Sequence, residues 1–415
     1  ITLPDKHVRK LYLDCYYDYF IDDEENEKDI QQFIDMTEGM KILDLRGIRE
    51  FKRLGEITSG QLNDVISLYK YGIKENPWDD IEREKLENNK IKDRIKGQDV
   101  AVEKSISIIK RAKTGFSGLQ HSSASKPKGI LFFAGPTGTG KTELAKAIAE
   151  LLFGDEGACR RFDMSEYSES HSAQKLFGAP PGYVGYESGG QLTNTIKEHP
   201  FSLLLFDEVE KASPTIWDKF LQILEDGRMT DGQGNTVYFS ECLIVFTSNL
   251  GIYQDVGGVK KRVVDMNMSY NELNKVVTKG IQDYFFSKGK PEVLNRIGKN
   301  LIVFNFIQPE AAKEILFSQI NKICKAVYSM KKIRIEFRND IVKEKLYQKV
   351  LTNLEEGGRG VGNIVEEYFT TPLSTYVFDN RIENGQTIII EDITGLNSDE
   401  SELEMPKIIA SLERN

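Results

Sequence analysis

Residues 131–142 read LFFAGPTGTGKT, an apolar run that leads directly into a glycine-rich turn. The turn has the spacing G-x-x-x-x-G-K-[ST] of a phosphate-binding loop, with Gly135 and Gly140 at its fixed positions. Backbone N–H groups surround phosphate oxygens only where no side chain intrudes, so the loop needs glycine. Residues 143–153, ELAKAIAELLF, predict a helix whose positive N-terminal end faces the anion. This context on both sides favours a phosphate site over a plain strand-to-helix turn.

The loop predicts both a nucleotide and a metal ion. Lys141 is placed to reach the β- and γ-phosphates of ATP, and the hydroxyl of Thr142 to bind Mg²⁺. We expect the nucleotide to contact the whole loop, which consists of Gly135, Pro136, Thr137, Gly138, Thr139, Gly140, Lys141 and Thr142.

Length and composition describe an ordinary globular chain. Its 415 residues are 40% apolar and 29% charged, which predicts two or three domains. The net charge of −9 argues against a broad nucleic-acid surface, so we expect no nucleic-acid partner. The four cysteines are scattered without metal-ligand spacing, which favours a reducing compartment. No apolar run reaches membrane length and no signal peptide is present, so we expect a cytoplasmic protein without a membrane partner. The sequence begins with Ile1 rather than Met, and we expect it to be part of a longer chain.

Two carboxylates end an apolar run about 65 residues after the phosphate-binding loop. We expect Asp207 to hold Mg²⁺ and Glu208 to polarise the attacking water. A strand that meets a solvated loop gives the same pattern, but the pairing with a phosphate-binding loop favours catalysis. Asn249 ends the next apolar run, where its amide would contact the γ-phosphate or the water; a turn-favouring asparagine is the alternative.

Short apolar runs alternate with helical patterns from residue 129 to residue 249, which predicts a parallel α/β sheet with phosphate bound at the carboxyl ends of its strands. From about residue 308 the pattern changes to helices at 309–330, 341–350 and 361–378, with strands at 333–337 and 385–393. Residues 1–72 predict a helical region, residues 73–93 a connector, and residues 395–415 a polar, acidic and mobile tail.

Residues 90–394, about three quarters of the chain, resemble the second ATPase module of the Clp family of AAA+ protein unfoldases, of the ClpA and ClpB type. The likeness is carried by RIKGQDVAVEKSISIIKRAKTGF, FFAGPTGTGKTELAKAIAE, RFDMSEYSESHSAQKLFGAPPGYVGYESGGQLT, LLLFDEVEKASPTIWDKFLQILEDGRMTDGQGNTVYF, FTSNLG and PEVLNRI. GAPPGYVG is the most specific of these, because nucleotide binding does not require it.

This resemblance implies a fold class: a P-loop AAA+ three-layer αβα sandwich with a parallel sheet over residues 94–307, followed by a small α+β lid over residues 308–394. Residues 1–72, with I-x-L-P-D-x-x-x-R and a T-E-G-M turn, resemble the end of another AAA+ module and its helical lid. An unrelated helical N-terminal domain is the alternative.

The resemblance also implies residue roles. Lys141 and Thr142 match Walker A, Asp207 and Glu208 match Walker B, and Asn249 matches the first sensor. Thr142 and Asp207 would hold the Mg²⁺. Three further residues have implied roles: Ile95 in the adenine pocket, Arg296 as the arginine finger of a neighbouring subunit, and Arg359 as the second sensor.

Three of these implied roles carry an alternative or a departure. A surface ion pair is the alternative for Arg296. Arg359 stands in Gly357-Gly358-Arg359-Gly360, which departs from the usual family pattern G-A-R-P/x-L, since Gly360 and Gly362 follow; this predicts a looser lid hinge. Lys96, beside Ile95, stands where the family more often has an apolar residue.

Tyr183 and Val184 match the pore loop that grips an extended polypeptide, since an aromatic ring packs against any side chain. A turn with Tyr183 packed in the core is the alternative. The glycine turn at residues 231–235 would be a second inner loop or a plain hairpin.

Together these features predict an ATP-hydrolysing ring motor, a homohexamer that unfolds, threads or remodels polypeptides through a pore, with adaptor proteins as further partners. Residues 251–277 lack the tripeptide with which such unfoldases dock a ClpP-type protease, so we do not expect that partner. No sustained heptad run of the disaggregase type appears in residues 1–90. A regulatory nucleotide switch without threading and a nucleic-acid remodeller of clamp-loader type are the alternative functions.

Overall fold

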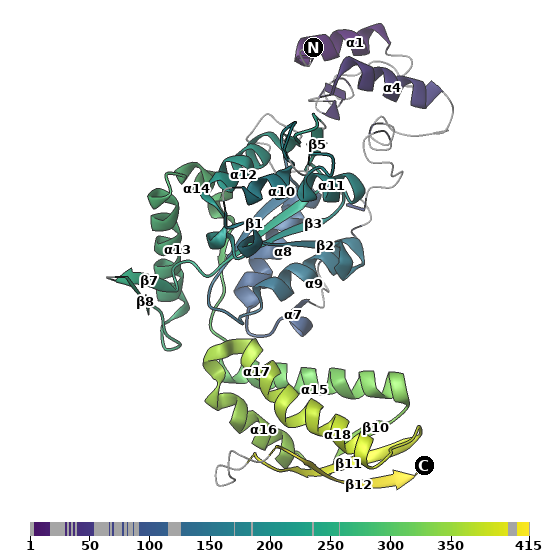
Figure 1. Cartoon of the computed structure of the whole chain (residues 1–415), viewed down its shortest axis with the longest axis vertical. Coiled ribbons are helices and arrows are strands. Elements are labelled where there is room, and N and C mark those ends of the chain that lie inside the picture. The colour runs from purple at the N-terminus through teal and green to yellow at the C-terminus, as the bar shows by residue number, and fades with distance from the viewer. Residues whose placement is uncertain are drawn as a thin grey trace.

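The computed structural model describes residues 4–16, 30, 33–34, 36–37, 40–53, 66, 69, 77–78, 81, 86, 91–114, 126–169, 171–183, 186–234, 236–256, 258–396 and 405–414. Figure 1 shows a small helical part at the N-terminus, a central sheet covered by helices, and a separate C-terminal part, which we call the lid (residues 308–396 and 405–414).

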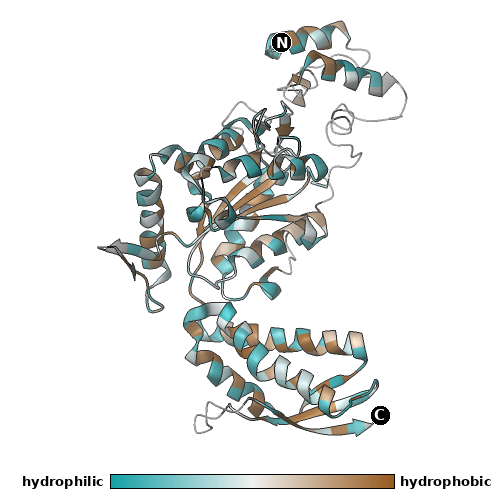
Figure 2. Ribbon diagram, in the orientation of Figure 1, coloured by the Kyte–Doolittle hydropathy of each residue, from teal (hydrophilic) through white to brown (hydrophobic). Residues whose placement is uncertain are grey.

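The central part is built on a five-stranded sheet with the order β2-β3-β6-β1-β9, in which every neighbouring pair is parallel. The strands are β1 (Gly129–Ala134), β2 (Cys159–Asp163), β3 (Leu203–Asp207), β6 (Leu243–Ser248) and β9 (Leu301–Val303). β3 and β6 are buried along their whole length, as expected for a parallel sheet covered on both faces. Their apolar residues form the brown centre of Figure 2.

Helices cover both faces of this sheet. Phe133 faces a core that includes α8 (Asp99–Lys113) and α9 (Lys141–Phe153). Its neighbour Phe132 faces a second core with α12 (Pro214–Asp226) and α13 (Tyr270–Ser287), because successive strand residues point to opposite sides. The predicted three-layer αβα sandwich is therefore confirmed.

Shorter elements complete the central part. They are the helices α7 (Ile91–Arg94), α10 (Ser172–Phe177), α11 (Gln191–Glu198) and α14 (Pro291–Ile297), the hairpins β4–β5 (Arg228–Thr230, Thr236–Tyr238) and β7–β8 (Tyr253–Val256, Val259–Arg262), and the 3₁₀ turns Glu156–Ala158, Met164–Tyr167, Val209–Lys211 and Gly298–Asn300. The segment without the protease-docking tripeptide thus forms the β7–β8 hairpin and the first half of α13.

The lid combines helices with a small sheet, as predicted. Its helices are α15 (Pro309–Lys331), α16 (Ile341–Thr352), α17 (Gly357–Val365) and α18 (Thr371–Asp379), with a 3₁₀ turn at Leu354–Glu356. A π-helical turn, Glu366–Thr370, joins α17 to α18. It ends two residues before Pro372, which lacks the N–H that the carbonyl oxygen of Tyr368 would accept in a regular helix.

The last strand of the lid corrects one prediction. β10 (Arg334–Phe337) pairs parallel with β11 (Gln386–Ile393), and β12 (Ile408–Arg414) pairs antiparallel with β11. The mobile tail predicted over residues 395–415 is therefore wrong for residues 408–414, which form an edge strand. Ile408 is buried in the lid core, and the side chain of Tyr376 donates to the carbonyl oxygen of Ala410 at 2.9 Å.

The N-terminal part contains α1 (Lys6–Cys15) and α4 (Ile42–Arg53), which agree with the predicted helical character. Leu13 and Leu45 belong to its small separate core. The predicted connector is not free of the central part, since Trp78 packs in the same core as α8 and α9 and donates to the carbonyl oxygen of Glu241 at 2.9 Å.

Candidate nucleotide site

The phosphate-binding loop joins β1 to α9 and depends on three glycines with positive φ. Gly135, Gly138 and Gly140 have φ values of 147°, 76° and 95°, which favour glycine over other residues. A Cβ on Gly140 would meet nothing within 4 Å, so the backbone at this position faces open space. The loop therefore leaves room for a ligand at the N-terminal end of α9, where helix N–H groups attract anions.

Lys141 lies at the base of this space and is buried. Its ammonium donates to the carbonyl oxygens of Gly135 and Pro136 at 2.7 and 2.8 Å and to Oδ1 of Asn249 at 2.9 Å. Burial, only partly offset by the charges of Glu210 and Asp207, lowers the pKa of Lys141 to about 8. The lysine is thus short of negative partners, a deficit that a phosphate group would fill.

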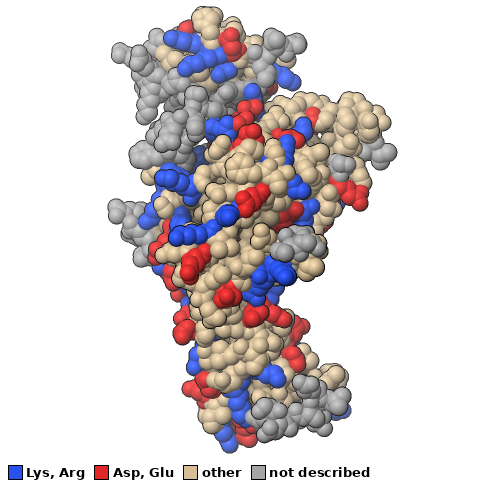
Figure 3. All heavy atoms as spheres, turned by 90° about the vertical axis from the view of Figure 1, so that its left-hand side faces the viewer, with Lys and Arg blue, Asp and Glu red and all other residues tan. Residues whose placement is uncertain are grey.

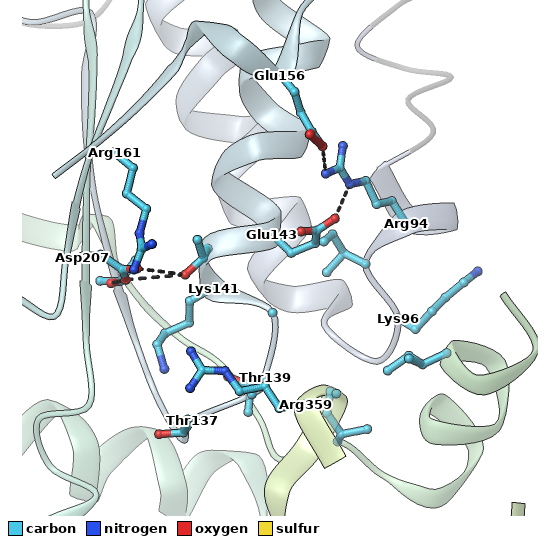
Figure 4. A pocket seen from close by; sticks show the side chains of 18 of the residues that line it. Arg94, Lys96, Thr137, Thr139, Lys141, Glu143, Glu156, Arg161, Asp207 and Arg359 are labelled. Atoms are coloured by element: carbon cyan, nitrogen blue, oxygen red, sulfur yellow. Dashed lines mark hydrogen bonds and ion pairs between the residues drawn. The ribbon is translucent and has the colours of Figure 1, made fainter. Parts of the chain in front are cut away.

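Asp207 ends β3 beside the loop and is surrounded by donors. Thr247 donates to its Oδ1, Nε of Arg161 donates to its Oδ2 at 2.8 Å, and the hydroxyl of Thr142 lies 3.5 Å from both oxygens (Figure 4). A hydroxyl and a carboxylate are hard oxygen ligands of the kind that Mg²⁺ takes, usually with several waters. No group of three or more His, Cys, Asp and Glu side chains placed for a metal occurs in the described part of the chain. The two side chains therefore fit a Mg²⁺ that is held mainly by water and phosphate.

Glu208 follows Asp207 and has a left-handed backbone, with φ 57°. Such a conformation costs a non-glycine residue about 1–2 kcal/mol. The N–H of Glu208 donates to the hydroxyl of Thr247 at 3.1 Å, and its carboxylate pairs with Lys211. Strained residues of this kind cluster at active sites, which agrees with the catalytic role predicted for Glu208.

Asn249 is fixed by a carboxylate that the motifs did not identify. Glu210 accepts from the N–H of Asn249 at 3.0 Å and from the hydroxyl of Ser248 at 2.8 Å. The amide of Asn249 in turn accepts from Lys141, so both predicted residues meet at the carboxyl edge of the sheet.

The loop residues 137–142 line a cavity of about 1080 Å³ that extends to the lid. Ile95, Ile307 and Ile315 line its apolar end, which suits the faces of a nucleotide base. Lys96 also lines the cavity and forms an ion pair of 3.3 Å with Glu314 of α15. Ile95 therefore lines the cavity, its role toward adenine stays a prediction, and Lys96 contacts the lid through Glu314.

Arg94, just before Ile95, was not predicted as a site residue. Its guanidinium contacts three carboxylates: Glu143 and Glu150 of α9, both at 2.7 Å, and Glu156 (Figure 4). Gln98, on the other side of the same loop, exchanges two hydrogen bonds with the backbone of Asn305. Arg94 therefore connects this end of the cavity to α9, which carries Lys141, and Gln98 connects it to the segment after β9.

Arg359 lies near the start of α17 and lines the same cavity, beside the phosphate-binding loop (Figure 4). Gly360 and Gly362, which follow it, differ in the space around them. A Cβ on Gly360 would lie 2.7 Å from the carbonyl oxygen of Asn353, whereas one on Gly362 would meet nothing within 4 Å. Gly360 therefore permits close packing inside the lid rather than a looser hinge.

Arg296 does not reach the cavity of its own chain. It lies in the last turn of α14 and pairs with Glu225 of α12. The surface ion pair considered as an alternative is thus present in the single chain. A role in a neighbouring copy stays a prediction.

Tyr183 is exposed, with 62% of its surface accessible, so the packed-core alternative is wrong. Val184 lies outside the described residues. The turn that follows β4 is the tip of the β4–β5 hairpin, and its Gln233 donates to the carbonyl oxygens of Tyr186 and Glu187 at 2.7 and 3.1 Å. The two predicted loops therefore support each other.

The residues that sequence reasoning missed are Arg94, Arg161 and Glu210. Each lies beside a recognised motif, but its partner is distant in sequence, and no spacing rule identifies it. The sequence did offer one hint, namely charged residues beside the motifs to which no role was given. Arg161 precedes Asp163 on β2, and Glu210 follows Glu208.

Residues 126–300 match a family model described as AAA domain (Cdc48 subfamily). The chaperone protein ClpB of Bdellovibrio bacteriovorus is 37% identical over 304 residues, which cover 72% of this chain and 33% of that protein. The mitochondrial chaperone protein ClpB4 of Arabidopsis thaliana is 33% identical over 362 residues, 85% of this chain and 36% of that protein. The chain spans about a third of the length of these curated relatives.

A closed-state cryo-EM reconstruction of Hsp104 with ATPγS and FITC-casein superimposes with a TM-score of 0.72 at 24% identity, and covers 99% of this chain and 69% of that one. At that identity the likeness concerns the fold. The family model and the ClpB relatives add sequence evidence over the part that contains the cavity. The chain therefore belongs to the Clp family of AAA+ ATPases.

Proposed function

We propose that this chain hydrolyses ATP as part of a hexameric ring that pulls polypeptide through a central pore. The observation that carries the proposal is the meeting of Lys141, Asp207 and Asn249 around one cavity, while Tyr183 stands exposed on a separate loop. The first group can bind and cleave a triphosphate, and the second can contact a polymer.

The chain's own residues divide the chemical work. Lys141 would leave its carbonyl partners for the phosphates, and Asn249, fixed by Glu210, would orient the γ-phosphate or the water. Glu208 would accept a proton from that water. Arg359 would add a positive charge from the lid side of the cavity.

Thr142 and Asp207 would hold Mg²⁺, which neutralises phosphate charge when it is bound. Arg161 donates to Oδ2 of Asp207 at 2.8 Å, so this carboxylate would contact both the arginine and the Mg²⁺.

Residues 1–72 would be the lid of an upstream AAA+ module. Support comes from their helices, their separate core and a structural likeness that covers 99% of the chain. A cytoplasmic location and adaptor partners remain predictions. No helix in the described part of the chain combines the length and apolar character needed to span a bilayer.

The test of hydrolysis is Glu208→Gln. The variant should bind ATP normally and accumulate it uncleaved, with turnover lowered about 100-fold or more because the base is lost. Nucleotide content and phosphate release are measured on the full chain. Undiminished turnover would contradict the assignment of the Walker B acid.

The test of threading is Tyr183→Ala, with Tyr253→Ala as its matched control, since Tyr253 is another exposed tyrosine, 53% accessible, on the β7–β8 hairpin. The first variant should unfold at least tenfold less of a fluorescent substrate protein per ATP cleaved, because the ring that grips the chain is missing. The control should match the parent. Equal unfolding by both variants would contradict the role of Tyr183, whereas a parent chain that cleaves ATP without unfolding the substrate would support a regulatory switch without threading.

A further inference from the structure

We propose that Gly358 of the lid and Gly138 of the phosphate-binding loop form a backbone latch that sets the affinity of the chain for nucleotide. The inference rests on the proposed function insofar as it concerns ATP. Its basis is a direct contact between two segments far apart in sequence: the N–H of Gly358 donates to the carbonyl oxygen of Gly138 at 2.8 Å.

The contact leaves little or no room for a side chain at three glycines. A Cβ on Gly138 would overlap the carbonyl oxygen of Glu356. One on Gly357 would lie 2.8 Å from the oxygen of Gly138, and one on Gly358 would lie 3.2 Å from the same atom. Gly138 and Gly357 also have positive φ, 76° and 63°, which favours glycine at both positions. The start of α17 therefore packs backbone to backbone against the loop.

The latch fixes a peptide group of the loop itself. A trans peptide is planar, so its carbonyl and the following N–H point in opposite directions. Holding the oxygen of Gly138 toward the lid therefore holds the N–H of Thr139 in one orientation. Thr139 lines the cavity, where backbone N–H groups of the loop are expected to contact phosphate.

Two further ion pairs connect the lid to the central part. Arg262, at the end of β8, contacts Glu355 at 2.9 Å, and Lys96 contacts Glu314 at 3.3 Å. Glu355 lies only three positions before Gly358, so the first pair supports the latch directly. Arg359, the next residue after the latch, is thereby set at the cavity.

Gly358 stands where the family pattern has alanine, so Gly358→Ala is the informative variant. Its methyl group would lie 3.2 Å from the oxygen of Gly138, a distance that forces the lid away from the loop by a few tenths of an ångström. Gly362→Ala is a matched control in the same helix, since its methyl group meets nothing within 4 Å. Alanine is the better helix former, so Gly362→Ala should keep or raise the melting temperature, and in Gly358→Ala the same gain offsets part of the cost of the close contact.

The experiment measures the dissociation constant of a fluorescent ATP analogue on the full chain, together with hydrogen exchange in the absence of nucleotide. Gly358→Ala should bind about tenfold more weakly than the parent and raise KM more than it lowers kcat. The amide at position 358 should exchange faster in this variant. Gly362→Ala should match the parent in affinity and in the exchange of that amide.

Equal affinity of the two variants, or unchanged exchange at position 358, would overturn the latch. A parent chain that binds no nucleotide would instead overturn the proposed function. In that case the exchange rates, which need no nucleotide, still decide whether the latch exists.

Discussion

At the scale of single residues, Lys141 best shows how the site is prepared for its ligand. The ammonium is buried, yet its direct partners are two carbonyl oxygens and an amide oxygen rather than a carboxylate. Its pKa is lowered to about 8 because burial outweighs the nearby acids. A bound triphosphate would favour the charged lysine and raise that pKa again.

This predicts that nucleotide binding takes up a proton above pH 8. The free chain loses the proton of Lys141 as pH rises through about 8, whereas the complex keeps it, so affinity for ATP should fall about tenfold between pH 7 and pH 9. Calorimetric titrations in buffers of different ionisation enthalpy measure the proton uptake. Lys141→Met should bind weakly at both pH values, and a parent affinity that is flat over this range would contradict the shift.

Asp207 shows how neighbouring strands share one site. Arg161 reaches it from β2 and Thr247 from β6, because the carboxyl ends of parallel strands lie along one edge of the sheet. The same edge brings Glu210 to Asn249. The proposed site is therefore built by residues from three strands and their following turns.

At the scale of elements, β12 matters most. It pairs with the edge of β11 that would otherwise be exposed in the lid. Its register places Ile408 opposite Ile393, inside the core, whereas Leu412 lies opposite Ile388 and is 40% exposed. Ile408 and Leu412 are four positions apart and lie on the same face of β12, so burial on this face decreases toward the end of the strand.

Ile408→Ala should lower the free energy of local unfolding of the lid by about 2–4 kcal/mol, because a buried side chain leaves a cavity. Leu412→Ala should cost less than about 1 kcal/mol. Hydrogen exchange of the β11 amides measures both. Similar protection in the two variants would show that β12 does not stabilise the lid.

At the scale of the whole molecule, Arg296 is the feature that a single chain does not explain. Its partner is Glu225, and it is absent from the residues that line the cavity. Acidic and basic side chains are interspersed on the face that carries α13 and α14 (Figure 3). A second copy that docks there would bring its own cavity toward Arg296.

Mixing two inactive variants tests this arrangement. Arg296→Ala keeps an intact cavity, and Lys141→Ala keeps the arginine, so a ring with both should contain some complete sites. ATP turnover of the mixture should exceed that of either variant alone by about tenfold, given the typical worth of such an arginine. In a control mixture, Glu310→Ala, a change in the lid, takes the place of one of the two variants. Mixed rings that form but stay inactive would contradict a shared site.

Several features can be predicted from the order of the amino acids alone: β1, the phosphate-binding loop and α9, the acids after β3, Asn249 after β6, and the long helix α15. Each of these follows from spacing or periodicity within a few residues, which local conformation and burial dictate. The resemblance to Clp ATPases, which rests on the same local motifs, predicted the fold. The five-stranded sheet with helices on both faces confirmed this prediction.

The partners of those residues, in contrast, depend on how the chain folds in three dimensions. Arg161 meets Asp207 across 46 positions, and Lys141 meets Asn249 across 108, because parallel strands bring distant segments to one edge. β12 escaped notice because an edge strand needs only one apolar face, so its polar residues read as a tail. The contact of Gly358 with Gly138 has no local signal at all, since it consists of two backbones that approach where side chains are absent.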